Sequence, residues 1–150
     1  MNAAESHPLI DPDLAFIRDA VAEMPIARTL GVEIVEVRRG HVELRTPIAE
    51  SMTFRPGQLQ AAAVFAAGDC AAVAAAGTLV GPGSWAATID GTIKLVAPAT
   101  GTGLRAVGRV VSAGRLLTTC AADVFAVDGD EERLCATWLG TARTMAPRLD

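Results

Sequence analysis

One carboxylate stands alone in the middle of this chain. Between Pro56 and Ile89 the only charged side chain is Asp69, within the small-residue run QLQAAAVFAAGDCAAVAAA. An ionised carboxylate without partners is costly to bury, so such a group usually has a raised pKa, a shell of hydrogen-bond donors, or both. Active sites use this environment to make a general base or a nucleophile. The structural alternative is that Asp69 lies at a solvated edge or bonds a backbone amide of a neighbouring element.

Other common catalytic groups are scarce. The two histidines, His7 and His41, lie far from Asp69 in the sequence, which argues against a Ser-His-Asp triad, a Cys-His pair or a His-rich metal site. The segment GPGSWAATIDG lacks the spacing and the lysine of a phosphate-binding loop, so we expect a simple connection there. Cys70 lacks an activating base and is expected to be a small core residue. We therefore expect no metal site.

The element that must position Asp69 is a long helix. The alanine content around it favours a helix that begins near Gln60 and Ala61 and ends at Gly77 or at the Gly81, Pro82, Gly83 cluster. Such a helix has almost no polar face, so it must be buried on most sides. The free backbone N–H groups at its start carry partial positive charge and could hold an oxyanion.

Asp69 and the start of this helix cannot serve one substrate within one chain. Gln60 and Asp69 are nine residues apart, which separates them by ~13 Å and turns them about 180° from each other. Two antiparallel copies of the helix in a symmetric assembly would bring Asp69 of one chain to Gln60 and Ala61 of the other. We therefore expect a homodimer or a homotetramer.

The remaining pattern predicts one α+β domain over residues 1–150, with a curved antiparallel sheet wrapped around the alanine-rich helix. An amphipathic N-terminal helix is expected over about residues 9–24, and a hairpin that turns at Arg39 and Gly40 follows it. A loop from Thr53 to Gly57 leads into the long helix. The predicted later strands are Trp85 to Val96, Gly103 to Ser112, Leu116 to Val127 and Leu134 to Thr144.

Composition limits the partners. A formal net charge of −4 gives no basic surface for nucleic acid or an anionic membrane. The apolar stretch 59–76 is not expected to span a membrane, because alanine adds little insertion energy and a central Asp69 costs about 2.5 to 3.5 kcal/mol. Three cysteines without CxxC spacing, and an N-terminus unlike a signal peptide, predict a reducing cytoplasm.

The motif around Asp69 resembles that of the hotdog-fold acyl-CoA thioesterases, in particular the phenylacetate-degradation (PaaI-like) branch. Those proteins have a Gly-x-Leu-His-Gly-Gly segment and an aspartate nine residues after the histidine, and here GQLQAAAVFAAGDCA places Gly57, Leu59 and Asp69 in register. The similarity runs from about Pro25 to Met145, and it includes TIDGTIKLVAPATGTGLRAVGRVVSAGR and CATWLGTA.

The resemblance implies roles for individual residues. Asp69 falls on the catalytic carboxylate, Ala61 on the residue whose amide polarises the thioester carbonyl, and Thr88 on a strand hydroxyl that assists the attacking water. The sequence departs from the family where Gln60 replaces the motif histidine and where Ala61 and Ala62 replace both glycines. Gln60 could donate a hydrogen bond to the thioester oxygen or could cap the helix.

The resemblance therefore implies hydrolysis of an acyl-CoA to a free acid and coenzyme A, with no cofactor beyond the coenzyme A of the substrate. Asp69 would act as general base or as nucleophile. Arg105 and Arg109 share one face of a strand and could contact the coenzyme A phosphates, although a solvated outer face is the usual place for such residues. The alternatives are a hotdog hydratase, which normally needs a histidine, and a non-catalytic acyl-binding hotdog protein.

Overall fold

The computed structural model describes residues 8–81 and 83–147 of the 150-residue chain. The helices are α1 (Ala15–Glu23), α2 (Pro25–Leu30) and α3 (Ala61–Gly77), with 3-10 turns at Pro12–Leu14 and Glu50–Met52. The strands are β1 (Leu9–Ile10), β2 (Glu33–Arg38), β3 (His41–Pro47), β4 (Thr53–Arg55), β5 (Gln58–Leu59), β6 (Trp85–Leu95), β7 (Gly103–Ala113), β8 (Leu117–Asp128) and β9 (Glu131–Met145). Among these residues no helix is long and apolar enough to cross a membrane.

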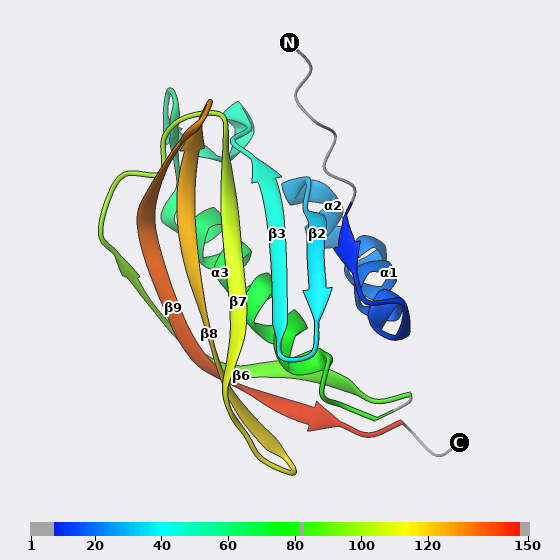
Figure 1. Cartoon of the computed structure of the whole chain (residues 1–150). Helices are drawn as coiled ribbons and strands as arrows, with labels where there is room; N and C mark the ends of the chain where they lie inside the picture. Colours follow the sequence, from blue (N-terminus) through cyan, green and yellow to red (C-terminus); the bar gives the residue numbers. More distant parts are fainter. Residues whose placement is uncertain (1–7, 82, 148–150) are drawn as a thin grey trace.

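Seven strands form one curved sheet around α3 (Figure 1). Their order is β1-β2-β3-β7-β8-β9-β6, and every neighbouring pair is antiparallel except β1 and β2. A long helix wrapped by a curved sheet is the α+β arrangement that the sequence predicts and the hotdog arrangement that the resemblance implies, so the fold class is confirmed. The parallel pair β1–β2 corrects the expectation of a purely antiparallel sheet.

Small residues allow the sheet to approach α3 closely. A Cβ added at Gly108 in β7 would overlap the carbonyl oxygen of Ala71, and one added at Gly68 would lie 3.0 Å from the Cβ of Trp138. The helix face that meets the sheet is made of valine, alanine and glycine (Val64, Ala67, Gly68, Ala71, Ala72, Ala75 and Ala76) and is buried. The alanine-rich composition of α3 is therefore a requirement of packing as well as of helix formation.

The largest buried side chain, Trp138, fills the space between α3 and the far strands of the sheet. Its ring meets Phe65 edge-on, with 6.0 Å between the ring centroids and 73° between the ring planes. Gly91 in β6 leaves room for the indole, because a Cβ there would lie 2.6 Å from it. Trp138 thus fixes the distance between α3 and strand β6, which carries Thr88.

The N-terminal segment differs from its prediction. The helix begins at Ala15 instead of about residue 9, because Leu9–Ile10 pairs with β2 and the side chain of Asp11 accepts a 3.0 Å hydrogen bond from the Asp13 amide. The short helix α2 was not predicted. It begins at Pro25 and ends at Leu30, and Gly31 after it has a φ of 67°, the left-handed conformation of a glycine cap.

Other boundaries agree more closely. The β2–β3 hairpin turns at Arg39 and Gly40 as predicted, and α3 is capped by Gln60 and ends at Gly77. The predicted loop at 53–57 is instead the small hairpin β4–β5, and β9 begins at Glu131 instead of Leu134. Of the Gly81, Pro82, Gly83 cluster, Pro82 lies outside the described residues.

Substitution of Gly108 tests the close approach of α3 to the sheet. Gly108→Ala should lower the free energy of unfolding by about 3 kcal/mol or more, the upper end for overpacking, because the new methyl group meets backbone that cannot rotate away. Gly81→Ala is the matched control, since a Cβ there meets nothing within 4 Å and its φ is ordinary. Urea unfolding of both variants measures the difference, and equal stability would contradict the packing argument.

Candidate active site

Asp69 lies in the third turn of α3, on the side of the helix that faces away from the centre of the sheet, and it is half-buried. The hydroxyl of Thr88 in β6 donates a 2.8 Å hydrogen bond to Oδ1 of Asp69. These two residues are 19 positions apart in the sequence, and the connection after α3 brings them together. Thr88, named from the resemblance alone, is therefore a direct partner of the carboxylate.

Two opposing effects act on the acidity of this carboxyl. Burial raises the pKa of Asp69, and the hydrogen bond from Thr88 lowers the pKa by stabilising the ionised form. Burial is the larger effect, so the pKa of Asp69 is raised overall. A carboxylate stripped of part of its water shell is a stronger base than one in bulk solvent, and Thr88 holds one of its oxygens in place.

An apolar hollow of about 400 Å³ opens beside Asp69. It is lined by α3, by the start of β6, by the N-terminal helix α1 with Met24 after it, and by Val80 and Ser84 of the connection that follows α3. Asp69 and Thr88 lie on the same stretch of wall, and Ile17 and Val21 of α1 lie on another. This size and this mostly apolar lining are typical of small-molecule pockets.

The contribution of α1 to this hollow was not predicted. Its apolar residues at spacings of three and four, among them Ile17, Val21 and Met24, indicated a helix with one buried face. That signal could not show which element the face covers. The structure places it over α3, near Asp69.

Cys70 follows Asp69 and also lines the hollow instead of lying wholly in the core. Burial and the neighbouring charge of Asp69 raise the pKa of its thiol to about 11. The thiolate is therefore scarce at neutral pH, and Cys70 is a poor nucleophile.

The start of α3 has a different arrangement. Gln60 is the N-cap, and its side-chain oxygen accepts a hydrogen bond from the amide of Ala62. The backbone carbonyl of Gln60 accepts from Ala63 at 3.0 Å and from Val64 at 3.3 Å. The amide of Ala61 donates to no described residue. Of the two roles considered for Gln60, the structure shows the capping one, and Ala61 offers the free donor.

The structure does not bring these two ends together within one chain. Ala61 lines a separate hollow, with Phe54, Leu59 and Pro98, that does not include Asp69 or Thr88. Gln60 lies nine residues before Asp69, a rise of ~13 Å as the sequence indicated, and Ala61 lies eight residues before it. A site that uses both needs a second copy of the chain.

The two arginines predicted to meet coenzyme A lie on the outer face of the sheet, outside the hollow. Arg105 makes two 2.8 Å hydrogen bonds to Glu132 and one of 3.1 Å to Glu43, and its guanidinium lies 4.7 Å from the centre of the Phe125 ring. Arg109 reaches Asp123 at 3.4 Å. A phosphate at Arg105 would compete with these carboxylates, and the phosphate-binding role of both residues stays a prediction.

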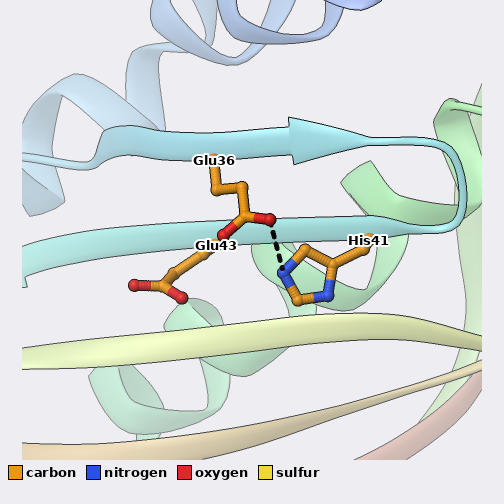
Figure 2. Close-up of side chains that lie close together, drawn as sticks. All are labelled: Glu36, His41 and Glu43. Atoms are coloured by element: carbon orange, nitrogen blue, oxygen red, sulfur yellow. Dashed lines mark ion pairs between the residues drawn. The ribbon is translucent and has the colours of Figure 1, made fainter. Parts of the chain in front are cut away.

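A second cluster of potential ligands lies on the outer face of the β2–β3 hairpin, where Glu36, His41 and Glu43 face one another (Figure 2). The Nε2 atom of His41 is 3.7 Å from a carboxylate oxygen of Glu36. Arg38 already bonds Glu36 at 2.7 Å, and Arg105 bonds Glu43. Since a divalent cation would have to displace both arginines, we interpret this cluster as a charge network. His7 lies outside the described residues.

Solved structures with the same architecture include several thioesterases. A thioesterase family protein from Silicibacter pomeroyi is 32% identical, with a TM-score of 0.84, and the match covers 87% of this chain and 96% of that chain. A conserved protein from Pseudomonas aeruginosa is 25% identical, with a TM-score of 0.74 over 84% and 98% of the two chains. No protein-family model matches the chain, and no curated protein matches its sequence.

The E. coli PaaI protein from the phenylacetic acid degradation operon shares the fold. It has a TM-score of 0.78 and covers 92% of this chain and 98% of its own, at 16% identity. At that identity the similarity concerns the fold alone.

The hydrogen bond from Thr88 can be tested by titration. Thr88→Val keeps the side-chain shape and removes the donor, so the pKa of Asp69 should rise further above its ordinary value of 3.8. NMR titration of the Asp69 carboxyl carbon measures the shift. Thr92→Val, on the same strand, is the matched control, and an unchanged titration in Thr88→Val would contradict the interaction.

Proposed function

Because the chain belongs to the hotdog-fold thioesterase family, as its motif indicated, we propose that it hydrolyses an acyl-CoA thioester to a free acid and coenzyme A. The observation that carries this proposal is the pair of Asp69 and Thr88 at the wall of an apolar hollow. The hollow offers a place for an acyl group, and the carboxylate lies where the thioester would enter. No cofactor is needed beyond the coenzyme A of the substrate.

Two routes use Asp69. As a general base, it removes a proton from water while the water oxygen attacks the thioester carbonyl carbon, and the carbon–sulfur bond then breaks to release the coenzyme A thiol. As a nucleophile, its carboxylate forms a mixed anhydride with the acyl group, and water hydrolyses that anhydride in a second step. In both routes Thr88 holds one carboxylate oxygen by its hydrogen bond, which leaves the other oxygen to react.

The negative charge that develops on the carbonyl oxygen needs a donor, and the free amide of Ala61 at the start of α3 is the candidate. It comes from a second subunit in this proposal, because Ala61 and Asp69 lie too far apart in one chain. Strand β6 supports pairing with a second copy of the chain, since it is an 11-residue strand at the edge of the sheet and the side chains of Ile89 and Leu95 on it are exposed. We therefore propose a homodimer, or a homotetramer built from such dimers, as the active form.

Two other functions compete with this proposal. A hydratase would need a histidine near Asp69, and the described histidine, His41, lies on the outer face of the sheet. A non-catalytic acyl-binding protein is favoured by one observation, namely that Gln60 uses its side chain as a cap where the family has a histidine. We also propose that the protein is cytoplasmic, as the pattern of its cysteines predicts.

Replacement of Asp69 separates hydrolysis from binding. Asp69→Asn should lower the rate of coenzyme A release by about 100-fold or more, because the amide is neither a base nor a nucleophile. Its carbonyl oxygen can still accept the bond from Thr88. A thiol-release assay over a panel of acyl-CoA substrates measures the effect, and a rate above about a tenth of the wild type would refute the role of Asp69.

The same variant should be at least as stable as the wild type at neutral pH. Since folding raises the pKa of Asp69, its ionisation disfavours the folded state above the ordinary pKa of 3.8, and asparagine removes that cost. The advantage should vanish at lower pH, where the carboxyl is protonated in both states. Urea unfolding at two pH values therefore shows that a lost rate is not a lost fold.

The amide of Ala61 can be removed without breaking the helix. Ala61 is the first residue of α3, where proline is well tolerated, and Gln60 before it has the extended ψ of 144° that a following proline requires. Ala61→Pro should lower turnover by about 100-fold or more, as loss of one oxyanion donor does. Ala61→Ser, which keeps the amide, is the matched control. Gln60→Ala should cause only a modest loss, because the backbone donor remains.

Mixing the two inactive variants tests the shared site. In a mixed dimer of Asp69→Asn and Ala61→Pro chains, one of the two sites contains an intact Asp69 and an intact Ala61, so activity should return to about half of the wild-type value per mixed dimer. If both residues acted within one chain, no activity would return. Sedimentation that shows an active monomer would also contradict the shared site.

A further inference from the structure

We infer that the hollow beside Asp69 is the acyl-binding site and that helix α1 closes it, so that it selects an uncharged apolar acyl group of up to about nine carbons. This inference rests on the proposed function, because it names the substrate class of that site. Three features of the described residues carry it: the wall along α3, the wall from α1, and the absence of a positive charge in the lining.

The first wall is a stripe of small and apolar residues along α3. Asp69, Val73 and Gly77 line the hollow at successive intervals of four residues, with Cys70 and Ala74 beside them, so the hollow follows one face of the helix for two turns. From Asp69 to Gly77 the helix rises about 12 Å. The carboxylate therefore lies at one end of an apolar track and Gly77 lies at the other.

Helix α1 forms the opposite wall and sets the far end. A Cβ added at Gly77 would lie 3.2 Å from Cδ1 of Ile17, so Ile17 packs against the glycine at the end of the track. Val21 of α1 and Met24, the residue that follows α1, continue this apolar wall. Ile17 and Val21 are buried, which shows that α1 is docked on α3 and is not a loose cover.

The length and volume of the hollow limit the acyl group. An extended alkyl chain with bonds of about 1.5 Å advances roughly 1.3 Å per carbon, so about nine carbons span the 12 Å track. A volume of about 400 Å³ holds roughly 13 non-hydrogen atoms if each occupies the ~30 Å³ of a water molecule. Both estimates favour a medium-chain acyl group and also admit a compact phenyl group.

The charge of the lining excludes other acyl groups. Asp69 is the only charged residue among the described residues that line the hollow, and no lysine or arginine faces it. A second carboxylate on the acyl chain, as in succinyl-CoA, would be buried without a partner and would be repelled by Asp69. The hollow thus selects against dicarboxylic acyl groups.

A chain-length series of acyl-CoA substrates tests the inference. In the wild type, kcat/KM should rise by about fourfold per added carbon, because each buried methylene contributes about 0.8 kcal/mol. The rise should stop at about nine carbons. Butyryl-CoA should exceed succinyl-CoA by at least about 100-fold. A wild type that shows no dependence on chain length, or that prefers succinyl-CoA, would overturn the inference.

Two variants move the limit in opposite directions. Val73→Phe fills the track about 6 Å from Asp69, four residues along the helix, and should end the rise at about four or five carbons. Ile17→Ala opens the far end and should extend the rise beyond nine carbons. Phe16→Ala is the matched control, since Phe16 lies on α1 with its side chain exposed and does not line the hollow. If Ile17→Ala fails to fold, Val73→Phe alone decides.

A binding measurement separates this inference from the proposed hydrolysis. Trp85 lines the hollow and is 49% exposed, so its fluorescence should change when an acyl chain covers it. Titration of the Asp69→Asn variant with octanoyl-CoA and butyryl-CoA should give tighter binding of octanoyl-CoA, and Val73→Phe added to it should remove the difference. If binding depends on chain length but the wild type releases no coenzyme A, the acyl-binding hollow is retained and the hydrolase is rejected. If the wild type hydrolyses acyl-CoA and Val73→Phe does not change its chain-length preference, the hydrolase is retained and the acyl-binding hollow is rejected.

Discussion

The close contact between α3 and the sheet is the constraint on which the rest of this structure depends. The backbone of α3 at Ala71 lies against Gly108 of β7, so Gly108 leaves no room for a side chain. Because the helix must be made of alanine and glycine to fit there, it has few polar side chains of its own. Asp69 therefore stands in apolar surroundings as a consequence of packing, and the raised pKa of its carboxyl follows from the same constraint.

Burial and hydrogen bonding are balanced at that carboxylate. Burial raises the pKa of Asp69, and the hydroxyl of Thr88 lowers it through one hydrogen bond. Two strong donors, or a buried arginine, would lower the pKa of Asp69 and make its carboxylate a weaker base. Without a donor, the carboxylate would have no fixed orientation and its pKa would be higher. A single neutral donor fixes the orientation and keeps much of the basicity. The cost is a loss of stability at neutral pH, as active sites often show.

Local patterns predicted the elements, and long-range packing decided the rest. The turn at Gly40, the limits of α3 and the three long strands after Gly103 follow from turn residues and composition, and the structure has them. Helix α2 was missed because the apolar residues around Pro25 are too few to show a period. Thr88 was named only from the resemblance, as a hydroxyl that assists the attacking water, and its hydrogen bond to Asp69 was not predicted, since 19 residues separate them and no local rule joins a strand hydroxyl to a helix carboxylate. The position of α1 over the hollow depends on Gly77 accepting Ile17, which no local pattern reveals.

The altered motif at the start of α3 is compatible with an oxyanion donor for a physical reason. Glycine would be indispensable there only if the backbone had a positive φ, and among the described residues positive φ values occur only at glycines elsewhere in the chain. Ala61 is the first residue of a regular helix, so its methyl group brings no backbone strain and its amide remains free. Gln60 supplies the cap by bonding Ala62 and leaves the amide of Ala61 unoccupied. The replacement of histidine and glycine therefore changes the space around the donor and not the donor itself.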